Sequence, residues 1–254
     1  MSKIWVSSLS VFGVVGMGSI AKRHISNLRR LHPLAKIYVI SSSGLNTTLP
    51  ENADAVLSLD EIIALEPRLV VVASPATSHV GHAKRLIQHG IPVLLEKPLA
   101  HSLQHCLDLV NFCADRSFNK VAVGYCLRFL PSMKIVKSLL ESGDLGAIYN
   151  VSANVGQHLP SWRTDKDYKT SVSASRALGG GALLELSHEL DYLFWLFGDL
   201  DLKHSWLRTT DELGLDVEEI ANLVLVSAAE DIYITLNLDF IQKYPQRTCE
   251  IVAE

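Results

Sequence analysis

A glycine-rich turn directly after a short apolar run is the feature that most constrains how this chain can fold. The segment reads Gly13-Val14-Val15-Gly16-Met17-Gly18-Ser19-Ile20-Ala21. Glycine permits a tight strand-to-helix turn and leaves the backbone open to a phosphate, and the helix that follows presents free N–H groups and the positive end of its dipole. We expect Gly16, Met17, Gly18, Ser19 and Ile20 to hold a dinucleotide pyrophosphate. A glycine-rich turn without a ligand is the alternative.

Strand and helix patterns alternate over the first 125 residues. Strands are predicted at Ser10–Val15, Lys36–Ile40, Leu69–Ala73, Pro92–Leu95 and Val121–Tyr125, and helices at Ser19–Leu31, His79–His89 and Leu103–Ala114. Strands separated by helices pair in parallel, so we expect an α/β domain over residues 1–125 with a doubly wound parallel sheet.

The pattern changes after about Leu130. A helix is predicted at Ser132–Leu140, a strand at Ala147–Val155, a polar loop over 157–177, a long apolar helix from Gly179 through Phe197, and strands at Leu202–Thr209, Glu219–Ser227, Ile232–Phe240 and Thr248–Val252. Successive strands without helices predict an antiparallel or mixed sheet, hence a second, α+β domain over residues 126–254. The last strand ends with the chain, so we expect this domain to be truncated.

The end of the second strand bears on the choice of cofactor. An acidic residue there would bind the ribose 2′-hydroxyl of NAD, but this strand ends in Ser41-Ser42-Ser43. The missing carboxylate removes repulsion against a 2′-phosphate, and the hydroxyls of Ser41 and Ser42 can donate to one. We therefore expect NAD(P), with a mild lean to NADP. A plain polar turn is the other interpretation.

Two further strand ends carry candidate residues. Ser74 and Pro75 follow one strand, where Pro75 can line a cofactor cleft. His79 has two interpretations: it faces the ribose, or it is a capping or solvated histidine. The sequence favours the second. Glu96 and Lys97 follow the next strand, at the carboxyl edge where ligands of open α/β sheets bind. An ammonium group there can stabilise a developing alkoxide. A purely structural Glu96–Lys97 couple is equally open.

A second constellation lies in the long helix predicted after the triple glycine. Glu185, His188, Asp191 and Tyr192 are spaced to share one helix face. A histidine flanked by carboxylates can relay a proton, with one carboxylate orienting the ring. Charged groups on so apolar a helix are costly unless they have partners.

Composition excludes several classes of function. The chain has 254 residues, 48% of them hydrophobic, and a net charge of −4, so no basic surface for nucleic acid is expected. No apolar run is long enough to span a membrane, and the N-terminal stretch lacks a cleavage site, which favours a cytoplasmic location. The cysteines, which we expect to be buried and reduced rather than bound to a metal or in disulfides, are Cys106, Cys113, Cys126 and Cys249.

Taken together, the ordered motifs resemble the Gfo/Idh/MocA oxidoreductases, the relatives of glucose–fructose oxidoreductase and inositol 2-dehydrogenase. The motifs are Gly16-x-Gly18-x-x-Ala21, Ser74-Pro75-x-x-x-His79, Glu96-Lys97-Pro98, Gly124-Tyr125-x-x-Arg128-Phe129, Trp162-Arg163 and Gly179-Gly180-Gly181 with His188-x-x-Asp191. The resemblance implies a Rossmann domain, then a domain with an open, mostly antiparallel sheet, and NAD(P)-dependent oxidation or reduction of a sugar or polyol.

The resemblance also implies roles for individual residues. Lys97 is similar to the catalytic lysine, His188 to the histidine that exchanges the proton, and Glu185 to its acidic partner, although the family commonly has Asp-x-x-x-His where this chain has Glu185-x-x-His188. At the cofactor, the other residues with implied roles are Glu96, Trp162 and Arg163. At the substrate, they are Tyr125, Arg128, Arg163 and Tyr168.

The expected function is therefore hydride transfer between nicotinamide and a sugar or polyol, with Lys97 and His188 converging on the reacting oxygen in a cleft between the domains. A homodimer or homotetramer is expected because the second sheet has an open face. A non-catalytic dinucleotide-binding sensor on the same fold is the alternative from another class. A reductase of a non-sugar carbonyl or imine is a third interpretation.

Overall fold

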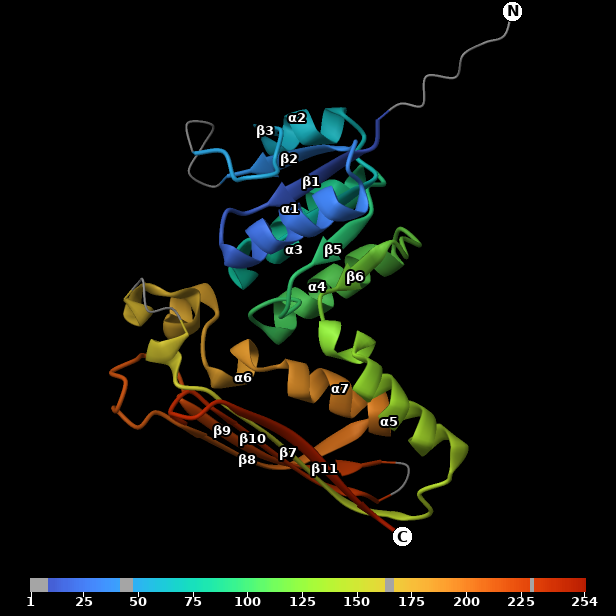
Figure 1. Cartoon of the computed structure of the whole chain (residues 1–254), viewed down its shortest axis with the longest axis vertical. Coiled ribbons are helices and arrows are strands. Elements are labelled where there is room, and N and C mark those ends of the chain that lie inside the picture. Colours follow the sequence, from blue (N-terminus) through green and yellow to red (C-terminus); the bar gives the residue numbers. More distant parts are fainter. Residues whose placement is uncertain (1–8, 42–47, 163–166, 229–230) are drawn as a thin grey trace, which may run out of the picture. The chain divides into compact units, whose positions relative to one another are not determined.

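The computed structural model describes residues 9–41, 48–162, 167–228 and 231–254. The chain divides into two compact units, of which the first ends at Gly124 and the second begins at Tyr125 (Figure 1). Each unit has its own sheet and its own hydrophobic core. We call them the N-terminal unit and the C-terminal unit.

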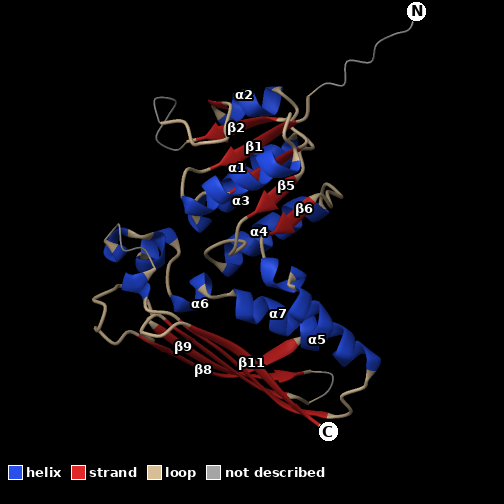
Figure 2. Cartoon of the chain, viewed as in Figure 1, coloured by secondary structure: helices blue, strands red, loops and turns tan. Residues whose placement is uncertain are grey.

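In the described part of the N-terminal unit, six parallel strands form one sheet in the order β3-β2-β1-β4-β5-β6 (Figure 2). The strands are β1 (Val11–Val15), β2 (Lys36–Ile40), β3 (Ala55–Val56), β4 (Leu69–Val72), β5 (Val93–Leu95) and β6 (Val121–Val123). The strands β1, β2 and β3 follow one another from the centre of the sheet toward one edge. The strands β4, β5 and β6 follow one another from the centre toward the other edge. The predicted doubly wound parallel sheet is confirmed.

Helices cover both faces of this sheet, which explains its continuous apolar strands. Successive residues of a strand point to opposite faces, yet Val14 and Val15 are 0% and 3% exposed. Val14 packs in the cluster that includes helix α1 (Ser19–Leu31), and Val15 packs in the cluster that includes helix α3 (Ala76–Gln88). Helices on the same side as α3 are α2 (Leu59–Ala64) and α4 (Leu103–Ala114).

Local sequence sets both ends of α1. Gly18 is its N-cap, with extended dihedral angles of φ −70° and ψ 177°. The helix buries Ala21, Ile25 and Leu28, which recur every three or four residues. Pro33 follows its C-cap and cannot continue the hydrogen-bond ladder. The limits predicted for this helix are confirmed.

Two short elements, β3 and α2, lie where no element was expected. The helix α2 has only six residues, too few for its apolar period to stand out. It nevertheless begins with a capping box, in which the Glu61 carboxylate accepts from the Ser58 backbone N–H at 2.7 Å and the Ser58 hydroxyl accepts from the Glu61 N–H at 3.3 Å. The spacing Ser-x-x-Glu is therefore a local signal for this helix.

In the C-terminal unit, the described strands form a five-stranded sheet in the order β11-β7-β10-β9-β8. They are β7 (Ile148–Gly156), β8 (Leu200–Arg208), β9 (Ile220–Ser227), β10 (Tyr233–Asp239) and β11 (Gln246–Ala253). The β7–β10 pair is parallel and the remaining pairs are antiparallel. The expected open, mostly antiparallel sheet is confirmed.

Helices cover one face of this second sheet (Figure 1). They are α5 (Pro131–Ser142), α6 (Ala182–Glu185) and α7 (His188–Phe197), and the short 3-10 helices are η1 (Cys126–Phe129), η2 (Leu159–Ser161), η3 (Tyr168–Thr170), η4 (Val172–Ala174) and η5 (Arg176–Leu178). The covered face is apolar: Ile234, Leu236 and Leu238 of β10 are all 0% exposed. Burial of this face supplies the core of the unit.

The opposite face carries a ladder of amide side chains. Asn222 Nδ2 donates to Asn237 Oδ1 at 2.6 Å, and Asn237 Nδ2 donates to Asn154 Oδ1 at 2.7 Å. Trp206 of β8 stands opposite Asn222 in the register and is 56% exposed. This face therefore combines satisfied polar groups with an exposed aromatic side chain.

The single long helix expected from Gly179 through Phe197 is wrong, because α6 ends at Glu185 and α7 begins at His188. The Leu186 N–H still bonds to the Ala182 carbonyl at 3.0 Å, but the Glu189 N–H bonds to the Leu186 carbonyl, three residues back, at 3.4 Å. The i to i−4 ladder is thus interrupted between the two helices.

The burial expected for the cysteines holds only in part. All four are free thiols; Cys106 and Cys113 are half-buried, whereas Cys126 and Cys249 are exposed. Burial was wrong for the last two because Cys126 begins η1 at the surface and Cys249 lies on the edge strand β11. No helix in the described parts of the chain is long and apolar enough to cross a membrane.

Candidate functional site

Several residues singled out in the N-terminal unit lie at one edge of its sheet. All strands are parallel, so their carboxyl ends meet at the same edge. Gly16 follows β1, Ser41 follows β2, Ser74 lies just beyond β4 and Glu96 follows β5. The strand order reverses between β1 and β4, which is where open α/β sheets bind their ligands.

Gly16 is required by the turn between β1 and α1. Its φ is +122°, and a Cβ there would lie 2.5 Å from the Ala73 carbonyl oxygen at the end of β4. The Gly16 N–H donates to the Ile40 carbonyl at 2.9 Å, which ties the turn to β2. Any side chain at this position would push the two central strand ends apart.

Gly18 has a different role, because a Cβ there would meet no neighbouring atom within 4 Å. It precedes an α1 N-terminus that has no side-chain cap and no acidic residue in its first turn. Ser19 is exposed beside it, and Met17 and Ile20 are half-buried against the core. The start of α1 thus has open space at the Cβ position of Gly18 and no carboxylate in its own first turn, which suits a phosphate.

The end of β2 is only partly described. Ser41 is half-buried. Ser42 and Ser43, and likewise Arg163 in the C-terminal unit, lie outside the described residues. Their expected contacts with cofactor or substrate stay predictions.

His79 is buried, so the capping or solvated interpretation is wrong. Its side chain is 1% exposed and it sits in the first turn of α3, which begins at Ala76 and has Pro75 as its N-cap. Nε2 lies 2.8 Å from the Ser74 carbonyl oxygen, and Nδ1 lies 3.0 Å from the Pro98 carbonyl oxygen. Carbonyl oxygens only accept, so a ring nitrogen that carries a proton donates to the main chain just beyond β4 or just beyond β5.

His82 lies on α3, one turn after His79, and its Nδ1 is 3.1 Å from the Ser74 hydroxyl oxygen. Burial lowers the pKa of His82, and the charges of His79 and Arg85 lower it further. The neutral ring is thereby favoured next to the candidate cofactor edge.

Glu96 has its main partner outside the Glu96-Lys97-Pro98 tripeptide. Its Oε1 accepts from His24 Nε2 of α1 at 2.6 Å, and Oε2 accepts from the Lys97 backbone N–H at 3.2 Å. Burial raises the pKa of the Glu96 carboxyl, but the bonds from His24 and Lys97 and their charges outweigh burial and lower it. Lys97 itself is half-buried directly beyond β5.

In the C-terminal unit, η1 and the start of α7 bring four candidate residues together. Arg128 donates from Nε and Nη2 to the Asp191 carboxylate at 2.7 and 2.6 Å, and these hydrogen bonds raise the pKa of the guanidinium. The Tyr125 ring meets His188 edge-on, with centroids 5.6 Å apart, and its hydroxyl donates to Ser187 Oγ at 3.4 Å. Glu185 ends α6 on the other side of the helix break.

The local structure explains why glycines stand at positions 180 and 181, without any ligand. A Cβ at Gly180 would lie 2.4 Å from the Val172 carbonyl oxygen, and Gly181 has a φ of +109°. A Cβ at Gly181 would also overlap the Glu218 carboxylate, which accepts from the Leu183 N–H at 3.0 Å. Glu218 therefore covers the start of α6, and sequence spacing did not indicate it.

Trp162 and Tyr168 are both packed within the C-terminal unit. The Trp162 ring meets Phe240 edge-on at 5.5 Å between centroids, and the Tyr168 hydroxyl donates to the Leu213 carbonyl at 3.0 Å. Glu189 was missed as a core group: it is 0% exposed and accepts from Arg247 Nε of β11 at 2.6 Å. A carboxylate within an apolar helix was the signal for such a partner.

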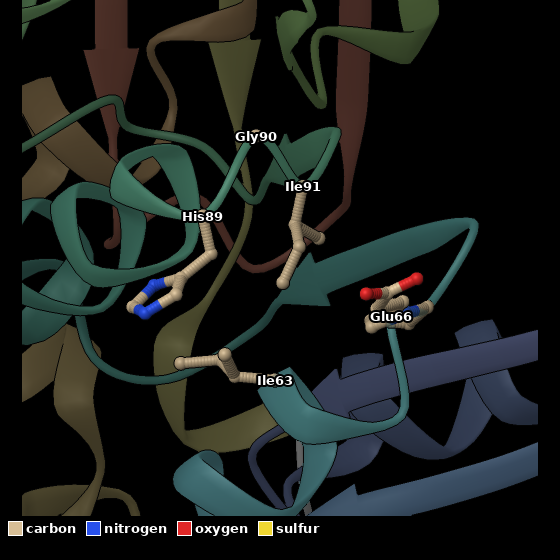
Figure 3. Close-up of a pocket in the computed structure, with 6 residues that line it drawn as sticks. Ile63, Glu66, His89, Gly90 and Ile91 are labelled. Atoms are coloured by element: carbon tan, nitrogen blue, oxygen red, sulfur yellow. The ribbon is translucent and has the colours of Figure 1, made fainter.

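A pocket of the N-terminal unit lies at the opposite edge of the sheet (Figure 3). It is formed by Ile63, Glu66, Pro67, His89, Gly90 and Ile91. Glu66 and Pro67 precede β4, and Gly90 and Ile91 precede β5, so the pocket faces the amino ends of the strands. It is therefore separate from the candidate cofactor edge. Among the described residues, no group of three metal-binding side chains is found.

Comparison with known families identifies both units. A family model described as "Oxidoreductase family, NAD-binding Rossmann fold" matches residues 11–125, and one described as "GFO/IDH/MocA C-terminal domain" matches residues 133–254. The chain belongs to the Gfo/Idh/MocA family. The resemblance stated from the motifs is confirmed, and the N-terminal unit is an NAD-binding Rossmann fold.

Curated Gfo/Idh/MocA relatives are longer than this chain. The rhizopine catabolism protein MocA of Rhizobium meliloti is 28% identical over 192 residues, which are 73% of this chain and 56% of that protein. An inositol 2-dehydrogenase of Ralstonia nicotianae is 25% identical over 95% of this chain and 71% of that enzyme. The chain spans about half the length of the first curated relatives that it matches.

A solved Gfo/Idh/MocA-like structure covers both units. The WlbA dehydrogenase from Bordetella pertussis, in complex with NADH and UDP-GlcNAcA, is 25% identical to this chain. The match covers 97% of this chain and 77% of that one, with a TM-score of 0.79.

Proposed function

We propose that this protein is an NAD(P)-dependent oxidoreductase that transfers hydride between nicotinamide and a hydroxyl or carbonyl of a sugar or polyol. One observation carries the proposal. The start of α1 after Gly18, which has no side-chain cap, and Lys97 both lie at the carboxyl edge of the Rossmann sheet. The relatives named for inositol dehydrogenation and the neighbour solved with NADH support it.

In this proposal the N-terminal unit binds the dinucleotide. The N–H groups at the start of α1 hold the pyrophosphate, with Met17, Ser19 and Ile20 around it. Ser41, Ser42, Ser74, Pro75, Trp162 and Arg163 complete the proposed cofactor site. The buried His79 and the His24–Glu96 pair support the edge of this site from behind. When bound, the nicotinamide supplies or accepts the hydride.

Lys97 and His188 carry the proposed chemistry. The Lys97 ammonium stabilises the negative charge that develops on the reacting oxygen. His188 takes the proton from the hydroxyl during oxidation and returns it during reduction. Glu185 is the proposed acidic partner of His188, and the Arg128–Asp191 pair holds η1 against the start of α7.

The substrate class follows from the proposed lining of the C-terminal unit. Tyr125, Arg128, Arg163, Tyr168 and His188 supply hydroxyl, guanidinium and imidazole groups, which suit a ligand with many hydroxyls. Among the two cofactors, the absence of a carboxylate directly after β2 favours NADP mildly, and Ser41 and Ser42 are its proposed contacts.

We further propose residues 1–125 as the cofactor domain and 126–254 as the domain for substrate and assembly. The helix-free face of the second sheet, with Trp206 exposed, supports a homodimer or homotetramer. The proposed location is the cytoplasm.

A sensor that binds the dinucleotide without catalysis is the second candidate. The spacing Glu185-x-x-His188 departs from the Asp-x-x-x-His common in the family and favours it, because a proton relay depends on how a carboxylate is placed beside its imidazole.

Turnover assays separate these functions. NAD and NADP are offered with a panel of polyols, and NADH and NADPH with keto-sugars, non-sugar carbonyls and imines. We expect turnover with at least one polyol or keto-sugar. Tight cofactor binding without any turnover would support the sensor, and turnover confined to non-sugar carbonyls or imines would overturn the substrate class.

A further inference from the structure

We propose that His24 and His79 are positioning residues for Lys97: they hold the residues on either side of it, so that the ammonium group leaves the sheet edge from a fixed point. The inference rests on the proposed catalytic role of Lys97. Neither histidine is proposed to touch the reacting atoms.

The first anchor comes from α1. His24 Nε2 donates to Glu96 Oε1 at 2.6 Å, and the two side chains are 19% and 13% exposed. Because the pair is mostly shielded from water, the bond is stronger than an exposed ion pair of the same length. It fixes the residue before Lys97 to the helix whose N-terminus is the proposed pyrophosphate site.

The second anchor comes from α3. The buried His79 ring lies between the carbonyl oxygens of Ser74 and Pro98, at 2.8 and 3.0 Å. A neutral imidazole has one N–H and donates to one of them, and the imidazolium form donates to both. Through the contact of Nδ1 with the Pro98 carbonyl, the ring ties the residue after Lys97 to α3, which begins directly beyond β4, the central strand beside the glycine turn.

Lys97 needs such anchors because no regular element holds it. The strand β5 ends at Leu95 and α4 begins at Leu103, so the segment between them belongs to no helix or strand. Within it, the Glu96 N–H donates to the Val72 carbonyl at 2.8 Å and the Lys97 N–H donates to its neighbour's carboxylate. The ammonium lies at the end of a four-carbon stem, so the backbone from which the stem starts must be fixed for the ammonium to be placed well.

Displacing a catalytic group by about 1 Å can reduce turnover about 100-fold. Loss of either anchor should therefore lower kcat while leaving the pyrophosphate site, and hence cofactor affinity, nearly intact. A residue needed only for folding would instead lower both together.

The test compares His24→Leu and His79→Leu with His24→Gln and His79→Gln, in which an amide N–H replaces the ring donor. His89→Gln is the matched control, since His89 is exposed at the C-cap of the same helix α3 and faces the other edge of the sheet. The first readout is hydrogen exchange at the backbone amides of Lys97, Leu99 and Ala100 in the cofactor-free protein. The second is kcat against NADH affinity, and the third is the unfolding midpoint.

We expect the leucine variants to raise exchange in this segment and to lower kcat about 10- to 100-fold with NADH affinity kept. The glutamine variants should recover a large part of both, and the control should match wild type. The proposal is overturned if exchange is unchanged in the leucine variants, if glutamine is no better than leucine in variants that stay folded, or if kcat and cofactor affinity fall together.

The exchange arm does not depend on turnover. If wild type has no activity with any substrate but the leucine variants exchange faster at Lys97, the proposed function fails and the two anchors stand. If wild type is active and exchange is unchanged, the anchors fail and the function stands.

Discussion

The two candidate catalytic residues are held in place in opposite ways. Lys97 stands in a segment without helix or strand, and side chains from α1 and α3 fix the residues beside it. His188 is the first residue of α7, so the helix itself fixes its backbone. The comparison shows that the backbone of a residue beyond a strand end is fixed by contacts from other elements, whereas the backbone of a helical residue is fixed by its neighbours in the sequence.

The electrostatic surroundings differ as well. Next to Lys97 the carboxylate of Glu96 is paired with a histidine. Near His188 the carboxylate of Asp191 is held in two hydrogen bonds by Arg128, a guanidinium that is always charged. The carboxylate beside Lys97 is thus paired with an imidazole, whereas the carboxylate near His188 is paired with a guanidinium through two hydrogen bonds.

Replacing Lys97 should have the largest effect. Lys97→Ala is expected to lower turnover about 10²- to 10³-fold, because a preorganised charge at the reacting oxygen is lost. Binding of the dinucleotide, measured by NADH fluorescence, should survive. Lys120→Ala, at an exposed lysine before β6, is the control. Unchanged turnover in Lys97→Ala would remove Lys97 from the chemistry.

His188→Ala should lower kcat about 100-fold, as expected for loss of a general acid–base. The profile of kcat/KM against pH should also flatten on one side of its optimum, because the group that exchanges the proton is lost. His204→Ala, on the exposed strand β8, serves as control. A variant with the wild-type profile would show that another group moves the proton.

The two glycines of the first turn should separate stability from binding. Gly16→Ala is expected to lower the free energy of unfolding by about 1–3 kcal/mol, because it strains the backbone and pushes on the Ala73 carbonyl. Gly18→Ala should change it by less than about 1 kcal/mol but weaken dinucleotide binding about tenfold. Urea unfolding and NADH titration of both variants check this, and equal losses of stability would contradict it.

Breaking the Arg128–Asp191 pair tests the support of His188. Arg128→Ala leaves Asp191, whose side chain is 9% exposed, without its partner and should cost about 1–2 kcal/mol of stability, reduced by water because Arg128 itself is 37% exposed. Lys203→Ala breaks the exposed Lys203–Asp201 pair and should cost less than about 0.5 kcal/mol. Similar losses in both variants, measured by urea unfolding, would show that the first pair contributes no more than a surface pair.

The smallest expected effect is on the free energy of unfolding at acid pH, and it concerns the His24–Glu96 pair beside Lys97. The folded pKa of Glu96 lies below the 4.5 of an unperturbed glutamate, so the stability it contributes is complete above pH 4.5 and is lost as pH falls through the folded value. The difference in unfolding free energy between wild type and Glu96→Gln should therefore narrow below pH 4.5. A constant difference over the acid range would contradict the ion pair with His24.

Much of the N-terminal unit could be predicted because its information is local. An apolar strand, a glycine turn and a helix with buried Ala21, Ile25 and Leu28 follow each other within about twenty residues, and parallel pairing follows from the alternation. The limits of α1, β2 and α4 agree with prediction for the same reason. The short α2 was missed although its capping box was visible in the sequence.

By itself, the sequence determined the order of elements, the doubly wound sheet and the edge at which Gly16, Ser41, Ser74 and Glu96 meet, because these depend on periodicity and on which residues permit a turn. Only the tertiary structure decided that His79 is buried between two carbonyls, that His24 is the partner of Glu96 and that the helix after the triple glycine is broken. The physical reason is that a hydrogen bond between residues 72 positions apart, such as His24–Glu96, depends on how helices pack on the sheet. The periodicity of the chain shows which face of a helix packs, but not which distant residue that helix meets.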